Sequence, residues 1–332
     1  MNLNFFQICQ TLIKDLPPRQ KEIISRRFAL SAVASSGGGG PKGETLESIG
    51  RDFSITRERV RQIEKDGFLK LKSKIKQCQK TFQYFQKYLE SRGGLQKEDT
   101  LLKALAGENQ KPQVYFLLSL AENFQRFGET EDFYPFWTID KNSLVLAEKI
   151  IDSFFNKLKK NNQALALKDF NPSLSLAPEA LTSYLEISKK IQQNSEGLFG
   201  LKDWPEINPR GIKDRAYLVF KKNNKPLHFT EVANLIEGSL VQTVHNELIK
   251  DPRFVLVGRG IYALEEWGYF PGQVKDVISK ILKEGREPLN KEEILEKVLK
   301  QRLVKENTVF LNLSNKKYFL RNSQGKYEIK EI

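Results

Sequence analysis

The first ninety residues carry apolar side chains at the three- and four-residue spacing of amphipathic helices. Between residues 3 and 30 this pattern is interrupted at Leu16-Pro17-Pro18. Because proline is tolerated at the start of a helix but not inside one, the segment predicts two helices. The period returns at Thr45 and continues to about Leu89, where Ser91-Arg92-Gly93-Gly94 interrupts it. We therefore expect a first helical domain over residues 1–90.

Residues 31–43 break the pattern inside this domain. Their centre is Ser35-Ser36-Gly37-Gly38-Gly39-Gly40-Pro41, a composition typical of flexible linkers. Since the entropy of closing a loop rises only slowly with its length, such an insertion is tolerated. We expect residues 31–43 to be mobile and largely dispensable.

Two stretches near the C-terminus repeat one pattern at identical offsets. In each, a helical segment with Thr-Val is followed by alternating apolar residues around a glycine-containing turn, which predicts a hairpin. Helix, helix, helix, hairpin is the order of a winged helix, and self-similarity of this kind indicates repeated units. We expect winged helices over residues 212–270 and 271–332. The shared positions are Val244, Leu248, Phe254, Gly260, Tyr262 and Leu264 in one copy and Val309, Leu313, Phe319, Gly325, Tyr327 and Ile329 in the other.

Two looser units precede this pair. Residues 91–140 offer a short helix, an apolar helix at 114–127 and an aromatic strand at 133–137. Residues 141–211 offer helices followed by an apolar, glycine-containing stretch at 197–204. Each is a possible winged helix. The 332 residues exceed what one core usually organises. The expected fold is mainly α with short β hairpins, a helix-turn-helix domain followed by a series of winged-helix units.

The strongest local pattern lies in residues 45–63. A helix-turn-helix needs apolar contacts between its helices and a small residue where they cross, and Gly50 stands at the crossing with Ser54 in the turn. Thr45 and Thr56 stand where N-caps belong, because their hydroxyls can accept the unpaired amides of a first helical turn. The expected contact residues are Ile49, Phe53, Ile55, Val60 and Ile63.

The polar face of the second helix carries the candidate DNA-binding residues. Arginine can bind guanine through two hydrogen bonds, glutamine can bind adenine, and glutamate accepts from cytosine. Lysines further along the helix could contact phosphates. The alternative is that these charges only form a solvated helix face. The candidates are Thr56, Arg57, Glu58, Arg59, Arg61, Gln62, Lys65, Lys70, Lys72 and Lys74.

The overall charge supports a polyanionic partner. The chain has 54 Lys and Arg against 41 Asp and Glu, a formal net charge of +13, which favours nucleic acid first and an anionic membrane surface second. The longest apolar run, Val114 to Ala121, is far shorter than the roughly 20 residues of a membrane span. Met1 to Cys9 does not resemble a secretion signal. We expect a cytoplasmic, nucleoid-associated protein without membrane contact.

The sparse cysteines and histidines do not indicate an enzyme. Cys9 and Cys78 are too far apart for a paired motif, and with His228 and His245 they do not make a convincing zinc site. Each histidine is more typical of a helix cap or a packed position, and clustered carboxylates are lacking. We expect free thiols, no metal, no cofactor and no catalysis.

At this point the chain resembles a known family. The fourth conserved region of housekeeping sigma-70-type factors is similar to Leu16-Pro17-Pro18-Arg19-Gln20, Arg26-Arg27-Phe28-Ala29-Leu30, Thr45-Leu46-Glu47-Ser48-Ile49-Gly50 and Thr56-Arg57-Glu58-Arg59-Val60-Arg61-Gln62-Ile63-Glu64. The resemblance implies contacts to the −35 promoter element through Arg57, Glu58, Arg59, Arg61 and Gln62. It also implies docking on the β flap of RNA polymerase. The insertion after Leu30 departs from the family pattern.

A second resemblance concerns the third winged unit. Residues 226–264 are similar to the HARE-type winged helix of the δ subunit of bacterial RNA polymerase and of some DNA-modifying systems.

Together these patterns predict a sequence-specific transcription regulator that binds double-stranded promoter DNA and works with RNA polymerase. The alternative is a polymerase-associated protein, a competitor of sigma region 4 or a δ-like factor, with little specific DNA binding. The residues before Leu16 include only Phe5, Phe6 and Lys14 as aromatic or basic side chains. Stand-alone promoter opening is therefore not expected. The target site, the sign of regulation and the oligomeric state stay open.

Overall fold

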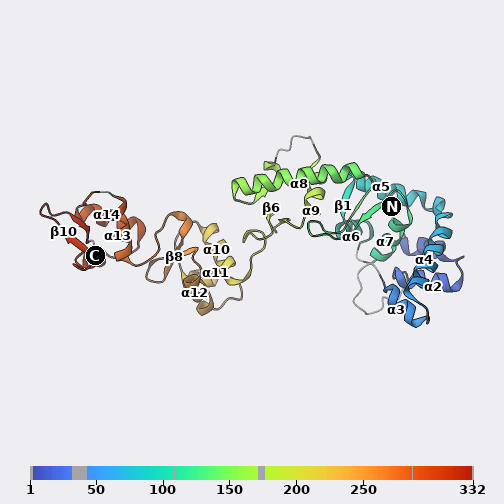
Figure 1. Ribbon diagram of the computed structural model, residues 1–332, viewed down its shortest axis with the longest axis horizontal. Coiled ribbons are helices and arrows are strands. Elements are labelled where there is room, and N and C mark those ends of the chain that lie inside the picture. Colours follow the sequence, from blue (N-terminus) through green and yellow to red (C-terminus); the bar gives the residue numbers. More distant parts are fainter. Residues whose placement is uncertain (1–2, 32–42, 108, 171–175, 286, 331–332) are drawn as a thin grey trace. The chain divides into compact units, whose positions relative to one another are not determined.

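The structure, a computed structural model, describes residues 3–31, 43–107, 109–170, 176–285 and 287–330. Helices dominate, and the strands form small antiparallel sheets, which confirms the mainly α fold with short β hairpins (Figure 1). The chain divides into two compact units, Met1–Lys202 and Asp203–Ile332. Among the described residues, every helix is too short or too polar to cross a membrane.

The N-terminal helices follow the predicted pattern. Pro18 is the first residue of the second helix, so the break at Pro17-Pro18 is confirmed. Residues 32–42, the body of the expected mobile insertion, lie outside the described residues. Beyond the insertion, the Glu44 amide donates to the carbonyl of Arg26 in α2 at 3.0 Å. The helices are α1 (Phe5–Ile13), α2 (Pro18–Arg27), α3 (Leu46–Asp52) and α4 (Arg57–Lys72).

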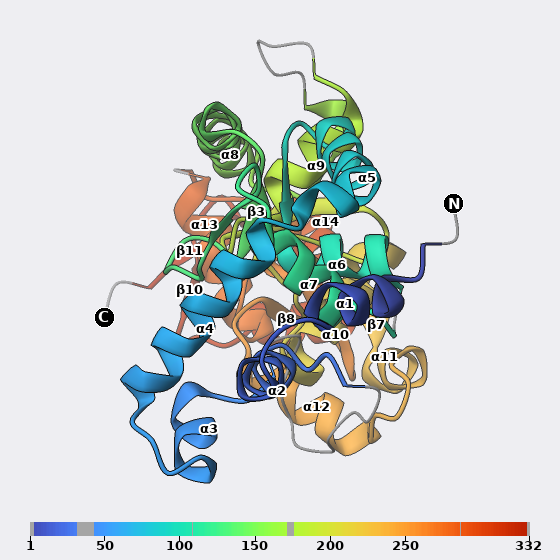
Figure 2. The ribbon, with the colours of Figure 1, turned by 90° about the vertical axis from the view of Figure 1, so that its right-hand side faces the viewer.

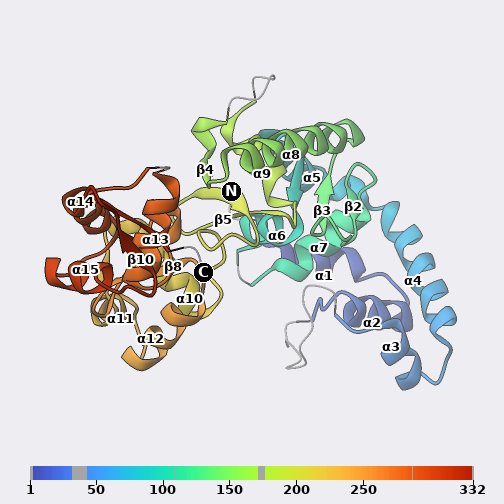
Figure 3. The same ribbon diagram turned by 60° about the vertical axis from the view of Figure 1, so that its left-hand side comes forward.

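The helix-turn-helix has its own small core. Figures 2 and 3 show α2 and α3 lying beside α4. At the crossing, a Cβ on Gly50 would stand 2.8 Å from the Ile55 carbonyl oxygen, so the close approach requires glycine. Ser54 turns the chain with a φ of 52°. The contact residues are those expected, with Ile23 and Leu46 added: Ile23, Leu46, Ile49, Phe53, Ile55, Val60 and Ile63.

Winged-helix-like units follow, and each of the first two pairs its first strand with its last. The sheet orders are β1-β3-β2 in the first unit and β4-β6-β5 in the second. The first unit contains α5 (Gln79–Ser91), β1 (Leu95–Lys97), α6 (Glu98–Ala106), α7 (Lys111–Leu120), β2 (Gln125–Phe127) and β3 (Phe136–Thr138), with η1 (Ile75–Cys78) before it. The second contains α8 (Lys141–Asn161), β4 (Leu165–Ala166), η2 (Leu167–Asp169), α9 (Pro178–Glu186), β5 (Ile191–Gln193) and β6 (Leu198–Leu201).

One expected helix is shorter than predicted. The apolar helix of the first winged unit ends at Leu120 rather than continuing to Phe127, because Gln125–Phe127 pair with β3 instead. The aromatic stretch around Trp137 forms the core strand β3. Trp137 is buried, and its Nε1 donates to the buried Glu98 carboxylate at 3.0 Å.

The last two units share one hairpin register. Phe254 faces Leu264 across β8 and β9, and Phe319 faces Ile329 across β10 and β11. In the fourth unit an isolated antiparallel bridge between Leu289 and Tyr327 takes the place that the first strand has in the third unit. The elements are α10 (Gly211–Asn223), β7 (Leu227–His228), α11 (Phe229–Leu235), α12 (Val241–Lys250), β8 (Phe254–Gly258), β9 (Ile261–Leu264), η3 (Glu265–Trp267), α13 (Val274–Glu284), α14 (Lys291–Gln301), α15 (Glu306–Leu313), β10 (Phe319–Arg321) and β11 (Tyr327–Ile329).

The largest hydrophobic core continues across residue 90. It includes buried side chains from α1 and α2 together with those of α5, α6 and α7. The centroid of the Phe28 ring lies 5.3 Å from the ring centroid of Phe68 in α4 and 5.2 Å from that of Phe116 in α7. The second winged unit joins this body through Tyr184, whose hydroxyl donates to the Gly93 carbonyl at 2.7 Å. Residues 3–202 therefore share continuous packing wherever the structure describes them.

The histidines and cysteines occupy structural positions. The His228 side chain caps α11, and the His245 ring stacks on Phe229 with 4.2 Å between centroids. Cys9 and Cys78 are free and buried. Burial raises the pKa of both thiols, which keeps them protonated at neutral pH. The described residues hold no group of three or more His, Cys, Asp or Glu that could bind a metal ion.

Candidate nucleic-acid interface

Both predicted N-caps are formed. The Thr56 hydroxyl accepts from the Arg59 amide at 3.2 Å, and the Thr45 hydroxyl accepts from the Ser48 amide at 3.1 Å. Val60 and Ile63 of α4 turn into the small core. The remaining side chains of the first two turns are exposed, apart from Glu64, which is half-buried. The exposed residues of this end of α4 are Arg57, Glu58, Arg59, Arg61, Gln62 and Lys65.

Several of these exposed side chains already bind one another. Arg61 donates to both Glu58 carboxylate oxygens, at 2.8 and 2.6 Å, and Arg59 donates to the Gln62 side-chain oxygen at 3.1 Å. The hydrogen bond from Arg61 holds the pKa of Glu58 below its usual value. These pairs lie in water, where such interactions are weak and exchange readily. The candidate base-binding groups are therefore exposed and paired with one another rather than buried.

The lysines beyond Lys65 have partners inside the protein. Lys70 donates to Gln20 of α2 at 3.0 Å, Lys72 pairs with Glu122 at 2.7 Å, and Lys74 pairs with Asp15 at 2.6 Å. Arg57 and Lys74 are 17 residues apart, and at about 1.5 Å per residue this is roughly 25 Å along the axis. The structure thus gathers the residues of the first turns of α4. Lys70 and Lys74 lie further along and bind groups of the protein itself, and Lys72 shares a pocket with Arg61 and Lys65 although it also pairs with Glu122.

A concave surface connects α4 to α7. A pocket of about 530 Å³ lies between these helices. Burial raises the pKa of Glu64 on its wall. Arg61, Lys65 and Lys72, three of the candidate residues, share this pocket with Arg27. Its apolar part consists of Phe28, Phe68, Leu69 and Tyr115.

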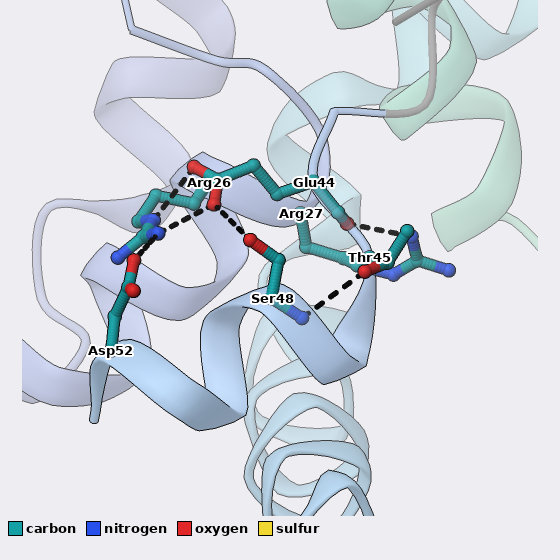
Figure 4. A network of polar contacts seen from close by, with 6 residues as sticks. All are labelled: Arg26, Arg27, Glu44, Thr45, Ser48 and Asp52. Atoms are coloured by element: carbon teal, nitrogen blue, oxygen red, sulfur yellow. Dashed lines mark hydrogen bonds and ion pairs between the residues drawn. The ribbon is translucent and has the colours of Figure 1, made fainter. Parts of the chain in front are cut away.

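The sequence pattern did not reveal the polar network that fixes α3 against α2 (Figure 4). Arg26 donates to Glu44 at 2.8 and 2.5 Å and also binds Asp52. Ser48 donates to the same Glu44 carboxylate at 3.3 Å. Arg27 donates to the Glu44 backbone carbonyl at 2.9 Å. Only the basic last turn of α2 was visible in the sequence, since the partners lie beyond the insertion.

Comparison with known proteins supports the N-terminal resemblance. The family described as Sigma-70, region 4 matches residues 12–73. The RNA polymerase sigma factor RpoD of Neisseria gonorrhoeae is 31% identical over 72 residues, which are 22% of this chain and 10% of that protein. RpoD of Helicobacter pylori (strain ATCC 700392 / 26695) is 39% identical over 64 residues, 19% of this chain and 8% of that protein. The chain thus spans about a tenth of these curated relatives.

The sigma region 4 resemblance is therefore confirmed. The match covers residues 12–73, and the relatives that share it are RNA polymerase sigma factors. The match ends at residue 73, so the HARE-type resemblance of residues 226–264 stays a prediction.

Proposed function

We propose that this protein is a sequence-specific DNA-binding regulator that acts at promoters together with RNA polymerase. The observation that carries the proposal is the capped first turns of α4, where arginines, Glu58 and Gln62 face solvent around a fixed helix start. This end of a recognition helix is the part that reaches base edges in the major groove. Such side chains supply donors for guanine and adenine and an acceptor for cytosine.

The candidate residues take different roles in this proposal. Thr56 fixes the helix start. Arg57, Arg59 and Arg61 bind guanines, and Lys65 contacts phosphate. Lys70, Lys72 and Lys74 would contact phosphate only after exchanging their internal partners, so we assign them a secondary role. Glu58 and Gln62 complete the set of base contacts.

The second candidate function is a polymerase-associated protein with little specific DNA binding. The pairing of Glu58 with Arg61 and of Arg59 with Gln62 favours it, since those groups are not free in this conformation. Docking on the β flap through apolar residues of α1, α2 and α4 would be hindered, because α7 of the same chain already packs there. This covered apolar face supports DNA as the primary partner of α4.

Selection of duplexes from a random pool tests the proposal directly. Arg59→Ala and Arg61→Ala should each lower affinity for the selected duplex by about 1–3 kcal/mol, roughly 5- to 150-fold, and affect a scrambled duplex much less. Lys80→Ala, an exposed charge removal on α5, is the control and should leave the preference unchanged. Equal losses on both duplexes, or failure to enrich any sequence, would favour the second candidate.

We also propose that the protein acts on polymerase carrying a complete sigma factor. The segment before Leu16 forms α1, whose Phe5 is buried in the main core and whose Phe6 is half-buried, so its two aromatic side chains are not presented together to a DNA strand. Run-off transcription with core polymerase and this protein as the only sigma-like component should give no specific transcript. Specific transcripts from a linear promoter duplex would refute this part of the proposal.

The C-terminal units complete the proposal. We assign residues 212–270 to a HARE-type winged helix and residues 271–332 to a second winged helix, because the two share strand register and helix order.

A further inference from the structure

The hairpin of the fourth winged unit is strongly basic. We define the C-terminal wing as residues 316–330, which contain β10 and β11 and lie near the C-terminus in Figure 1. Glu328 is its only acidic residue. Four of its cations are exposed and Lys326 is half-buried. The basic residues are Lys316, Lys317, Arg321, Lys326 and Lys330.

The third winged unit shows that the fold does not require this charge. Leu256 faces Tyr262 across one hairpin, and Arg321 faces Tyr327 across the other, so the two wings can be compared position by position. Where the C-terminal wing has cations, the third unit has acidic or apolar residues. The counterparts, in order, are Asp251, Pro252, Leu256, Ile261 and Glu265.

The third wing is also occupied by contacts within its own compact unit. Arg253 pairs with Asp251 at 2.6 Å and with Asp214 at 2.8 Å. On the strand, the Val257 carbonyl accepts from the Leu303 amide at 2.6 Å. The charge of Arg253 is thus neutralised locally, and part of the strand edge is covered by chain from the following unit.

The C-terminal wing lacks such neutralisation. Among the residues that the structure describes, none of its five cations forms an ion pair with a carboxylate. Arg321 donates only to the Gly325 carbonyl, at 3.1 Å, across the turn. Lys317 of the wing and Lys275 outside it both lie near Tyr318, with their ammonium groups 5.7 and 5.0 Å from its ring centroid. This concentration of unpaired positive charge is suited to a polyanion.

The helix that would enter a groove carries no basic residue. α15 contains Glu306 as its only charged side chain and holds no Lys or Arg between Glu306 and Leu313. Since phosphate contacts come mostly from lysine and arginine, α15 itself offers none, whereas the wing beside it offers five cations. At about 3.3 Å per residue, residues 316–321 span at most roughly 16 Å, enough for several phosphates of a duplex.

We infer that the C-terminal wing binds the sugar-phosphate backbone of duplex DNA without recognising bases. It provides a second DNA contact, separate from α4 and carried by a different compact unit. The choice of DNA over other polyanions rests on the function proposed above, because a wing tethered to a DNA-bound α4 meets the same duplex at high effective concentration.

The test compares two variants of the full-length protein that remove the same amount of charge. The wing variant is Lys316→Gln, Lys317→Gln, Lys330→Gln, and the matched control in the third unit is Lys222→Gln, Lys250→Gln, Arg259→Gln. All six side chains are exposed. Affinity for a duplex of random sequence is measured against salt concentration. Removing one lysine–phosphate interaction makes the slope of log affinity against log salt shallower by about 0.9, so the slope should fall by about 2.7 in the wing variant and little in the control.

The outcomes separate this inference from the function proposed for α4. Arg59→Ala should remove the preference for the selected duplex while keeping the salt dependence contributed by the wing. Equal slopes for the two triple variants would overturn the inference. The inference would also be overturned if the wing variant kept the salt slope of DNA binding but no longer bound phosphatidylserine-containing vesicles. The wing would then be a membrane contact. If the triple variant has an altered melting curve, the double variant Lys316→Gln, Lys317→Gln, which leaves both strands intact, is used instead.

Discussion

Arg26 joins two segments that the chain separates by the insertion. Its guanidinium binds the carboxylates of Glu44, just before α3, and of Asp52, the last residue of α3, and so fixes both ends of α3 against the end of α2. The hydrogen bonds from Arg26 hold the pKa of Glu44 below its usual value. A carboxyl group with a lowered folded-state pKa adds stability only while it is ionised.

Glu44→Gln should therefore destabilise the fold in a pH-dependent way. At neutral pH the expected loss is about 1 kcal/mol, because the pair is partly screened by solvent. The contribution of Glu44 is complete above the ordinary glutamate pKa of about 4.3 and is lost as the pH falls through its lower folded-state value. Urea denaturation should thus show a difference from wild type at pH 7 that shrinks in acid. Glu47→Gln, on the exposed side of α3, is the control, and an equal effect there would contradict the assignment.

Two lysines of the candidate interface should behave differently. Lys65 lies beside the turns proposed to bind bases, and Lys65→Ala should weaken all duplexes alike while lowering the salt slope by about 0.9. Lys74 is held by Asp15, so Lys74→Ala should leave DNA affinity unchanged. Titration of both variants with selected and scrambled duplexes decides between these roles. A salt slope reduced by Lys74→Ala would show that the pair with Asp15 opens on DNA.

At the scale of single residues, local chemistry was predictable and distant partners were not. The caps at Thr45 and Thr56 depend only on the next three residues, so the sequence was sufficient to locate them. The pairs of Lys72 with Glu122 and of Arg26 with Glu44 join residues separated by long stretches of chain. No spacing rule identifies such partners.

The crossing of α3 and α4 depends on one glycine. Gly50 lies inside a helix, where alanine is normally preferred by up to about 1 kcal/mol. An added methyl group would nevertheless meet the Ile55 backbone oxygen at 2.8 Å, and backbone cannot move aside as a side chain can. The steric effect should therefore exceed the gain in helix propensity.

Gly50→Ala should destabilise the helix-turn-helix by about 1–3 kcal/mol, the usual cost of overpacking. Gly67→Ala is the matched control within α4, since its methyl group would meet only the end of the flexible Ile24 side chain. Thermal unfolding of both variants should show the larger loss for Gly50→Ala. If the two losses were equal, the close backbone approach would not be the reason for glycine at position 50.

At the scale of elements, strong periodicity was a reliable guide and short strands were not. The helix-turn-helix and the paired C-terminal hairpins carry repeated apolar positions, and the structure forms both. β2 and β4 contain three and two residues, too few to establish a period of two. For that reason α7 was predicted to continue into residues that belong to β2.

At the scale of the whole molecule, motifs and cores have different boundaries. The sigma-like motif ends at residue 73, and the sequence break lies near residue 91. The main core nevertheless extends from α1 to Trp137. Burial of Phe28 against both Phe68 and Phe116 shows that α7 completes the core begun by the sigma-like helices. The sequence therefore shows where the motif ends, but it does not show how far the core extends, because that depends on contacts between distant residues.

This shared core predicts which fragments fold. Five apolar residues of α7 are buried: Val114, Phe116, Leu117, Leu118 and Leu120. Removing a buried large apolar side chain typically costs about 2–5 kcal/mol, and a domain has only about 5–15 kcal/mol of stability in total. Loss of the whole helix therefore exceeds what the remaining packing can supply. The fragment 1–90 should be unfolded or aggregated, although it contains the complete sigma-like motif.

The fragments 1–202 and 203–332, by contrast, should each fold cooperatively, because each retains the contacts of one compact unit. Circular dichroism melting curves of the three fragments provide the measurement, and the sum of the two larger fragments' spectra should reproduce that of the full chain. A cooperative transition of 1–90 near that of 1–202 would show that α7 is an accessory to the sigma-like domain. The apolar face of α1, α2 and α4 would then be available to a partner such as the β flap. That result would favour the polymerase-associated function, because the main argument against it is that α7 covers this face.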